Sequence, residues 1–449
     1  MARVLGPQGV GINTYTGAII QYFVLFGGLG IGLYGNRQIA YVRDNRQKLS
    51  NTFWEIQILK VITVSVAFIG FCIYLFFIHE YRIYLILQSL YIFATGFDIS
   101  WLYEGIEDFK KTFTRNTLVR IISLVLILFF VKDAKDVWLY ILILAVSNLA
   151  GYVALWPTLS KVIDNVDFKR LRPFRHLKGI IVLFVPFLAL NIYPVINKTI
   201  LKSIVGIDSS GYYEKSDVMI RMALAIVTSI SAVMLPHTSK AFAENKLEKI
   251  KDLLGKSFDY VSLLSFPIAF GMAAIAPKFG VFFYGSGFKP VGNAMFIEAF
   301  AIIFMGWSSI VGNQYLIPTR QTNFYSKSVI IGSLINIFLD VPLINLFGLN
   351  GAALATVISE GYIAVYQIWV IRKQVRLTTV LENIIKYIVS ALIMFIFVFV
   401  ISGVFKMTVI SLIIQIIVGF LVYLLFLKVL KPTTLQEVSN VMLQILKRN

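Results

Sequence analysis

The sequence has few charged residues, few histidines and almost no cysteine. Of its 449 residues only 14% are charged and 58% are hydrophobic, whereas soluble domains have about 25% charged and about 45–50% apolar residues. A soluble fold is therefore excluded. Because Cys72 is the only cysteine and the three histidines are far apart in the chain, an intrachain disulfide and a thiolate zinc site are excluded as well. We expect no metal ion and no cofactor.

Motifs of nucleotide-driven and enzymatic chemistry are also missing. The sequence has no GxxxxGK[ST] phosphate-binding loop, so we do not expect this chain to hydrolyse ATP. No polar stretch is long enough to form a soluble catalytic domain. An enzyme is therefore not the expected function class.

Long apolar runs are abundant instead. About 20 apolar residues cross a bilayer as a helix, so thirteen such runs predict an all-α polytopic membrane protein with thirteen transmembrane helices. The predicted spans cover residues 11–35, 54–78, 83–106, 116–131, 139–156, 180–204, 218–239, 259–283, 294–317, 328–347, 350–371, 384–404 and 407–429.

Basic residues outnumber acidic ones by 41 to 23, and they alternate from loop to loop. The loops on one side of the predicted membrane hold 28 Lys and Arg, and those on the other side hold 7. Because basic loops remain in the cytoplasm, this asymmetry predicts a multi-pass protein of the cell membrane with a cytoplasmic C-terminus. The net charge of +18 then reports orientation, and nucleic acid is not an expected partner.

A weak internal repeat with an offset of 200 residues relates the two halves of the chain. GPQGVG from Gly6, before the first span, resembles GIDSSG from Gly206, before the seventh. The spans that follow also correspond, which predicts two bundles of six helices. The span 180–204 then has no counterpart in the first half. We therefore expect that this chain lacks its first transmembrane helix and that the full protein has fourteen.

The loops and spans together predict five regions. Basic residues concentrate in a linker between the halves, and the last residues place apolar side chains on one helical face. The regions are an N-terminal bundle (1–160), a basic cytoplasmic linker (161–179), a C-terminal bundle (180–375), two additional helices (376–431) and an amphipathic cytoplasmic tail (432–449).

Five predicted spans carry polar residues at helical spacing. An ionisable side chain in a span costs about 2.5–3.5 kcal/mol on insertion scales, so it usually faces a cavity or a partner. The stripes predict a water-accessible interior shared between helices. Their members are Asn191, Lys198 and Lys202; Asp217, Arg221 and Thr228; Gln88, Tyr91, Thr95 and Asp98; Ser333, Asn336 and Asp340; and Thr356, Glu360 and Gln367.

Simpler interpretations of these residues stay open. Lys202 lies near a helix end, as does Lys278, and both can extend to the lipid headgroups. Asp217 and Arg221 are four residues apart and can pair with each other. Structural hydrogen bonds between helices would explain four further residues. These are Lys198, Asp98, Asp340 and Glu360.

Seven sequence blocks carry a resemblance to a known family. In chain order they are RVLGPQGVG from Arg3, YGNRQIAYVRD from Tyr34, DISWLYEGIEDFKK from Asp98, GYYEKSDVMIRM from Gly211, FPIAFGM from Phe266, NQYLIPT from Asn313 and FGLNGAALATVISE from Phe347. These blocks resemble the Wzx-type polysaccharide flippases, which handle O-antigen, capsule or exopolysaccharide repeat units. That family belongs to the multidrug/oligosaccharidyl-lipid/polysaccharide exporter superfamily. The chain departs from the expected pattern at Asn197, where an acidic residue is usual, and at Asp340, where Asn is usual.

The resemblance implies a flippase that carries an undecaprenyl-diphosphate-linked oligosaccharide across the membrane by alternating access, coupled to an ion gradient. Expected partners are this substrate, membrane lipid, and the polymerase and chain-length regulator of the same pathway. The candidate residues fall into three groups. Those for the diphosphate are Lys198, Lys202, Arg221 and Arg37; those for the sugar are Gln88, Tyr91, Thr95 and Asn191; those for ion coupling are Asp98, Asp340 and Glu360.

Two other functions stay open. A multidrug or small-metabolite cation antiporter of the same superfamily would share the two-bundle plan, although intramembrane basic residues favour an anion. A polytopic polysaccharide polymerase or glycosyltransferase is the second alternative. The short loops on the outer side count against it.

Overall fold

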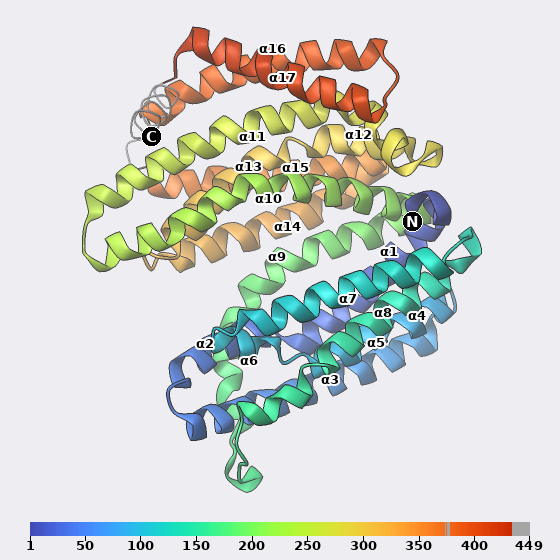
Figure 1. The fold of residues 1–449 in the computed structure, drawn as a ribbon, viewed down its shortest axis with the longest axis vertical. Helices are drawn as coiled ribbons and strands as arrows, with labels where there is room; N and C mark the ends of the chain where they lie inside the picture. Colours follow the sequence, from blue (N-terminus) through green and yellow to red (C-terminus); the bar gives the residue numbers. More distant parts are fainter. Residues whose placement is uncertain (373, 375–377, 433–449) are drawn as a thin grey trace. The chain divides into compact units, whose positions relative to one another are not determined.

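The computed structural model describes residues 1–372, 374 and 378–432, and this part of the chain consists of helices and their connections (Figure 1). Twelve of its helices are long and apolar enough to cross a membrane, or up to thirteen when the bent pair Ser286–Glu298 and Ala301–Leu316 is counted as one span. The predicted all-α polytopic fold is therefore confirmed. Residues 433–449, nearly all of the predicted tail, lie outside the described residues.

Residues Met1–Gly211 form the first of two compact units. Helix α1 is central to it, because α1 packs against α3, α4, α5, α8 and α9. Helix α9 contacts α1 and α2 and so belongs to this unit. The predicted division into two six-helix bundles stays a prediction. The helices are α1 Ala2–Gly28, α2 Ile31–Val42, α3 Arg46–Phe77, α4 Arg82–Gln88, α5 Leu90–Phe97, α6 Ser100–Gly105, α7 Phe109–Phe130, α8 Val137–Val153 and α9 Leu177–Ile204.

The second unit begins at Tyr212, within α10. Helix α11 packs against α12, α13 and α16, and α14 pairs with α15. Figure 1 shows α16 and α17 running side by side along α11. The helices are α10 Ile207–Ala243, α11 Leu247–Tyr284, α12 Lys289–Glu298, α13 Ala301–Ser308, the π-helical turn η6 Ser309–Leu316, α14 Thr322–Phe347, α15 Leu349–Ile371, α16 Thr378–Val404 and α17 Val409–Leu430.

The first transmembrane segment differs from the predicted span 11–35. Helix α1 already begins at Ala2 and includes the glycine-rich stretch as a kink at Gly6, where φ is 66° and ψ is 177°. It ends because Leu29 and Gly30 adopt left-handed backbone angles, with φ of 45° and 67°. An α-helix cannot continue through left-handed residues. The predicted single span is therefore divided into α1 and α2.

The internal repeat has a backbone explanation. Gly6 and Gly206, 200 residues apart, both have positive φ, at 66° and 127°, which glycine adopts without steric cost. Their partners Gly11 and Gly211 approach each other closely. A Cβ on Gly211 would lie 2.8 Å from the backbone nitrogen of Gly11, and a Cβ on Gly11 would lie 2.2 Å from the carbonyl oxygen of Ile207. The repeated glycines allow α1 to touch the first turn of α10.

This contact predicts that Gly11→Ala destabilises the protein. The added methyl group overlaps a backbone oxygen that cannot rotate away, and overpacking of this kind costs about 1–3 kcal/mol. Gly32→Ala is the matched control, because a Cβ there has nothing within 4 Å and alanine favours a helix. In thermal unfolding of the purified protein, Gly11→Ala should lower the midpoint by several degrees. An unchanged midpoint would contradict the close contact.

The predicted span 83–106 is broken into α4, α5 and α6. A break in a membrane helix leaves carbonyl groups that other groups must satisfy. The carbonyl oxygen of Gly96 accepts a hydrogen bond from Gln57 at 2.7 Å, and that of Phe97 accepts one from the indole of Trp156 at 2.8 Å. Side chains from distant segments therefore stabilise the break.

The end of the basic linker is fixed by a buried carboxylate. Glu55 of α3 accepts hydrogen bonds from the backbone N–H of Arg172 at 2.9 Å and forms an ion pair with Arg175 at 2.5 Å. It also lies 2.9 Å from Nε2 of His176, whose Nδ1 is 2.9 Å from the Tyr34 hydroxyl. This network holds the start of α9 against α2 and α3.

Candidate functional site

Helix α9 presents its predicted polar residues along the first unit. Lys198 is half-buried, and its carbonyl oxygen accepts a hydrogen bond from the Ser210 hydroxyl at 2.5 Å. The neighbouring Thr199 lies 3.0 Å from the hydroxyl of Tyr22 on α1. Asn191 donates to the carbonyl of Phe187 on its own helix at 2.8 Å. Lys198 is therefore a half-buried cation within the predicted span 180–204.

Lys202 occupies a different environment at the end of the same helix. Its ammonium forms an ion pair with Glu80. It also lies over two aromatic rings, 5.1 Å from the centre of Tyr15 and 5.7 Å from that of Tyr81. Cation–π contacts of this kind stabilise a lysine by about 0.5–2 kcal/mol. The charge of Lys202 is thus compensated by groups of its own unit.

The other two predicted diphosphate residues lie on α2 and α10. Arg37 is exposed, and its guanidinium lies 5.6 Å from the ring centre of Tyr41. Arg221 contacts both carboxylate oxygens of Asp217, at 2.7 and 2.9 Å. The pairing that the four-residue spacing predicts for Asp217 and Arg221 is confirmed.

The polar stripe of the broken span makes mostly structural contacts. Gln88 is buried and donates to the carbonyl and side-chain oxygens of Asn13 at 3.2 and 3.1 Å. Thr95 donates to the carbonyl oxygen of Tyr91 at 2.9 Å. Tyr91 itself is half-buried. Three of the predicted sugar residues therefore share one stripe, and two of them already donate to oxygens of this chain.

Asp98 lies where α5 ends, and it is surrounded by donors. Its Oδ1 accepts from the backbone and hydroxyl of Ser100 at 2.9 and 2.5 Å. The Lys60 ammonium, only 2% exposed, donates to the Asp98 carbonyl at 2.6 Å and lies 3.7 Å from Oδ2. Arg115 donates to the Ser100 hydroxyl at 2.9 Å. Lys60 thus compensates this carboxylate, and Arg115 contacts it only through Ser100, which favours the structural interpretation of Asp98.

A double-substitution experiment measures that structural role. Asp98→Asn leaves the buried ammonium of Lys60 without its counter-charge, which should lower the free energy of unfolding by about 3 kcal/mol. Adding Lys60→Met removes the buried charge, so the double variant should recover most of that loss. The measurement is the thermal midpoint of each purified variant. A double variant no more stable than Asp98→Asn alone would show that the pair is not a stabilising unit.

In the second unit, polar groups of α10, α12, α14 and α15 meet around Tyr213. The Tyr213 hydroxyl lies 2.9 Å from that of Thr356. Asp217, Glu298 and Asp340 are all close enough to act electrostatically on the Tyr213 phenol. We call these three residues the carboxylate cluster. Asp217 and Asp340 belong to polar stripes that the sequence predicts, on α10 and α14. Glu298 belongs to no predicted stripe.

Glu298 is the member of the cluster that the sequence analysis missed. It is 1% exposed, its Oε2 accepts from the Ser216 hydroxyl at 2.5 Å, and its Oε1 has no hydrogen-bond partner among the described residues. It ends α12, where the span bends by 48°. A lone glutamate inside an otherwise apolar run was the available signal.

The remaining predicted ion-coupling residues lie on the α14–α15 pair. Asp340 is fully buried, at 0% exposure, and Glu360 is 7% exposed. The amide of Asn336 donates to the Ser359 hydroxyl across the pair at 3.4 Å. Burying a carboxylate is costly unless it is paired, takes up a proton or binds a cation. Within the described residues, no group of three or more His, Cys, Asp or Glu side chains is arranged to hold a metal ion.

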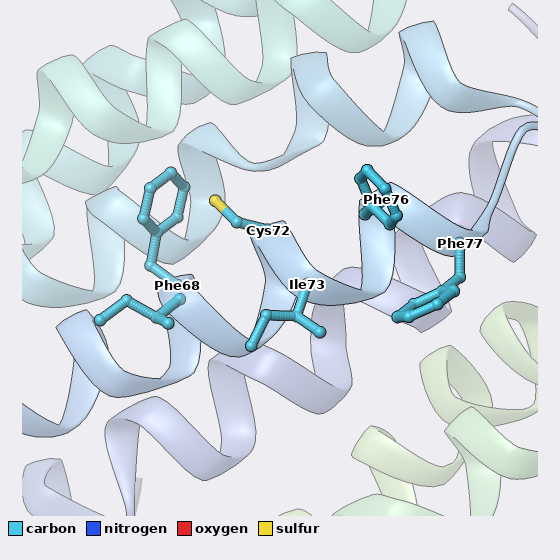
Figure 2. A pocket seen from close by; sticks show the side chains of 6 residues that line it. Phe68, Cys72, Ile73, Phe76 and Phe77 are labelled. Atoms are coloured by element: carbon cyan, nitrogen blue, oxygen red, sulfur yellow. The ribbon is translucent and has the colours of Figure 1, made fainter.

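A surface hollow on α3 is lined mainly by apolar side chains, unlike the polar groups described above. Its volume is about 470 Å³, and it is lined by residues of α3 alone. Figure 2 shows the Phe68 ring and the Cys72 thiol on the same side of the helix. The lining residues are Phe68, Ile69, Cys72, Ile73, Phe76 and Phe77. Because the lining side chains are apolar apart from the Cys72 thiol, we expect lipid acyl chains to fill this hollow.

Comparisons with known proteins identify a family and several relatives of this chain. A family described as "Polysaccharide biosynthesis protein" matches residues 1–242. The chain is similar to a proposed O-antigen transporter of Escherichia coli (strain K12), with 23% identity over 369 residues, which is 80% of this chain and 88% of that protein. It is also similar to the lipid II flippase MurJ of Bacillus subtilis (strain 168), with 27% identity over 154 residues, 34% of this chain and 28% of that protein.

Solved structures support the fold independently. An inward closed conformation of the lipid II flippase MurJ has a TM-score of 0.74 at 18% identity, covering 94% of this chain and 92% of that chain. An inward-facing multidrug resistance transporter of the MATE family, in the MOP superfamily, has a TM-score of 0.66 at 14% identity and covers 83% and 92%. The resemblance noted in the sequence is thus confirmed. Since the family match spans more than half of its residues, the chain belongs to the polysaccharide biosynthesis protein family.

Proposed function

We propose that this protein moves an oligosaccharide linked to undecaprenyl diphosphate from the inner to the outer leaflet of the cell membrane, for export of a surface polysaccharide. The observation that carries the proposal is the half-buried Lys198 within the spanning part of α9. A charged side chain inside the bilayer is energetically costly, so where one occurs it usually has a functional role. A diphosphate crossing the membrane needs such a partner.

The proposed binding residues lie in different surroundings. Lys198 is the principal diphosphate residue, and Arg37 attracts the headgroup from the cytoplasmic side. Arg221 and Lys202 each have a carboxylate partner that a diphosphate would have to displace. The sugar would contact the polar stripe of the first unit. The proposed sugar residues are Gln88, Tyr91 and Thr95 of that stripe, together with Asn191 of α9.

Transport would proceed by alternating access, with the C-terminus in the cytoplasm. Coupling to an ion gradient is supported by the carboxylate cluster together with Glu360, because taking up a proton or a cation there changes the charge of a buried site. Asp98 is the weakest coupling candidate, since Lys60 compensates it. The polymerase and chain-length regulator of the same pathway are the proposed downstream partners.

The proposal is tested in proteoliposomes that contain the purified full chain. The probe is the undecaprenyl-diphosphate-linked oligosaccharide extracted from the source organism, labelled in one leaflet. Protein-containing vesicles should move the label across the bilayer, and empty vesicles should not. Equal rates in the two preparations would contradict the proposed function.

A cation antiporter is the second candidate, and the buried carboxylate cluster is the observation that favours it. Carboxylates would suit a cationic drug or metabolite better than a diphosphate. The same vesicles, loaded with a fluorescent lipophilic cation and given an ion gradient, separate the two functions. Gradient-driven movement of the cation without movement of the lipid-linked sugar would favour the antiporter.

A further inference from the structure

The end of the first unit that the loop charges assign to the outer side carries a group of side chains that we call the tyrosine–lysine cluster. It consists of Tyr15 of α1, Glu80 and Tyr81 before α4, and Lys202 of α9. The rings of Tyr15 and Tyr81 meet edge to face, with centres 6.0 Å apart. The Lys202 ammonium lies over both rings and pairs with Glu80. Three separate segments of the chain thus converge on one lysine.

The backbone of Tyr81 is held in an unfavourable conformation. Its φ is 56° and its ψ is 22°, in the left-handed region that side chains other than glycine rarely adopt. Such a conformation is unfavourable, and it persists where the surroundings impose it, often at functional sites. Here it places the Tyr81 ring against Tyr15 and Lys202. The unfavourable backbone conformation of Tyr81 therefore positions its aromatic ring.

The cluster also has hydrogen-bonding capacity left over. Glu80 is largely exposed, its side chain being 58% accessible. Asp208, beside the cluster, has a buried Oδ1 without a hydrogen-bond partner among the described residues. Burial, and after it the negative charge of Glu80, raises the pKa of Tyr81, with a smaller contribution from Asp208. Glu80, which interacts with both the Tyr81 phenol and Lys202, is therefore the exposed acceptor of the cluster.

These groups match the chemistry of a sugar better than that of a diphosphate. The Lys202 ammonium is already neutralised by Glu80, and Asp208 adds a negative charge that would repel a phosphate. A sugar ring offers faces of C–H bonds, which pack on aromatic rings, and hydroxyl groups, which donate to carboxylates and accept from ammonium groups. We propose that the tyrosine–lysine cluster binds the oligosaccharide of the lipid-linked substrate at the outer end of the first unit.

This inference rests on the proposed function and moves Lys202 from the diphosphate to the sugar. Its test compares two probes on the purified full chain in nanodiscs. One probe is undecaprenyl diphosphate without sugar, and the other is the undecaprenyl-diphosphate-linked oligosaccharide extracted from the source organism. Because both carry the same lipid and diphosphate, the difference between their affinities reports the sugar contact alone.

Tyr15→Leu and Lys202→Met should each weaken binding of the oligosaccharide lipid about tenfold, the effect of losing roughly 1.4 kcal/mol of contact. Neither should change the affinity for undecaprenyl diphosphate. Lys132→Met is the matched control, because Lys132 is an exposed lysine of a predicted outer loop that donates to a carbonyl four residues earlier, that of Leu128. It should alter neither affinity.

The outcomes distinguish a sugar contact from other roles. Equal losses for both probes would overturn the inference, because the cluster would then bind the diphosphate or only maintain the fold. Unchanged affinities for both probes would overturn it too. In both cases wild-type protein still binds, and the proposed function survives. Wild-type protein that binds neither probe contradicts the proposed function itself, and this inference with it.

Discussion

Replacing Lys198 with methionine should reduce transport of the lipid-linked oligosaccharide by roughly 100-fold. Methionine keeps the length and apolar stem of the side chain but removes its charge. If the ammonium holds the diphosphate in the membrane, the loss of this charge-assisted contact costs about 3 kcal/mol. The rate of label transfer in proteoliposomes measures the effect, and Lys198→Arg, which keeps the charge, should retain most of the activity.

Lys278→Met is the matched control for this experiment. Lys278 is also a lysine within a predicted span, but its ammonium donates to the carbonyl oxygens of Gly403 and Phe405, at 2.9 and 3.1 Å, at the end of α16. Its loss should affect stability and leave the transport rate per folded molecule nearly unchanged. If Lys198→Met and Lys278→Met slow transport equally, the charge of Lys198 has no special part in it.

Relations within one helix could be predicted from the sequence. Asp217 and Arg221 pair because residues four apart lie on the same face of a helix, whatever surrounds them. The apolar runs likewise predict the spans, since crossing a bilayer requires a fixed length of helix. The start of the first span was misplaced because a glycine-rich stretch is compatible with a loop and with a kinked helix. The close packing of Gly11 against Ile207 is a tertiary contact that the stretch itself does not predict.

Relations between helices could not be predicted in the same way. The partner of Lys202 is Glu80, 122 residues away in the sequence, and nothing in the local pattern of either residue points to the other. Lys60 lies within the predicted span 54–78, and nothing in its spacing shows that it compensates Asp98, 38 residues away. Spacing along one helix identifies a polar face. It does not say which neighbouring helix supplies the partner, and that partner decides whether a charge is structural or available to a substrate.

The carboxylate cluster leads to the second large prediction, which concerns Asp340 and Glu298. Asp340→Asn and Glu298→Gln preserve side-chain size and hydrogen-bonding atoms, but neither new side chain can exchange a proton or attract a cation. If either carboxylate couples transport to a gradient, its variant should transport at the same rate with and without the gradient. We expect the gradient-driven rate to fall at least about tenfold, the effect of losing roughly 1.4 kcal/mol of coupling.

Asp259→Asn is the control that separates coupling from burial. Asp259 is also a buried carboxylate of the second unit, but it accepts hydrogen bonds from Asn383 at 3.0 Å and Tyr387 at 2.9 Å, which fasten α16 to α11. Its substitution should lower the amount of folded protein, while each folded molecule still responds to the gradient. Loss of the gradient response in all three variants would mean that any buried carboxylate of this unit has the same effect. A response retained in Asp340→Asn and Glu298→Gln would place the coupling site elsewhere, with Glu360 the next residue to test.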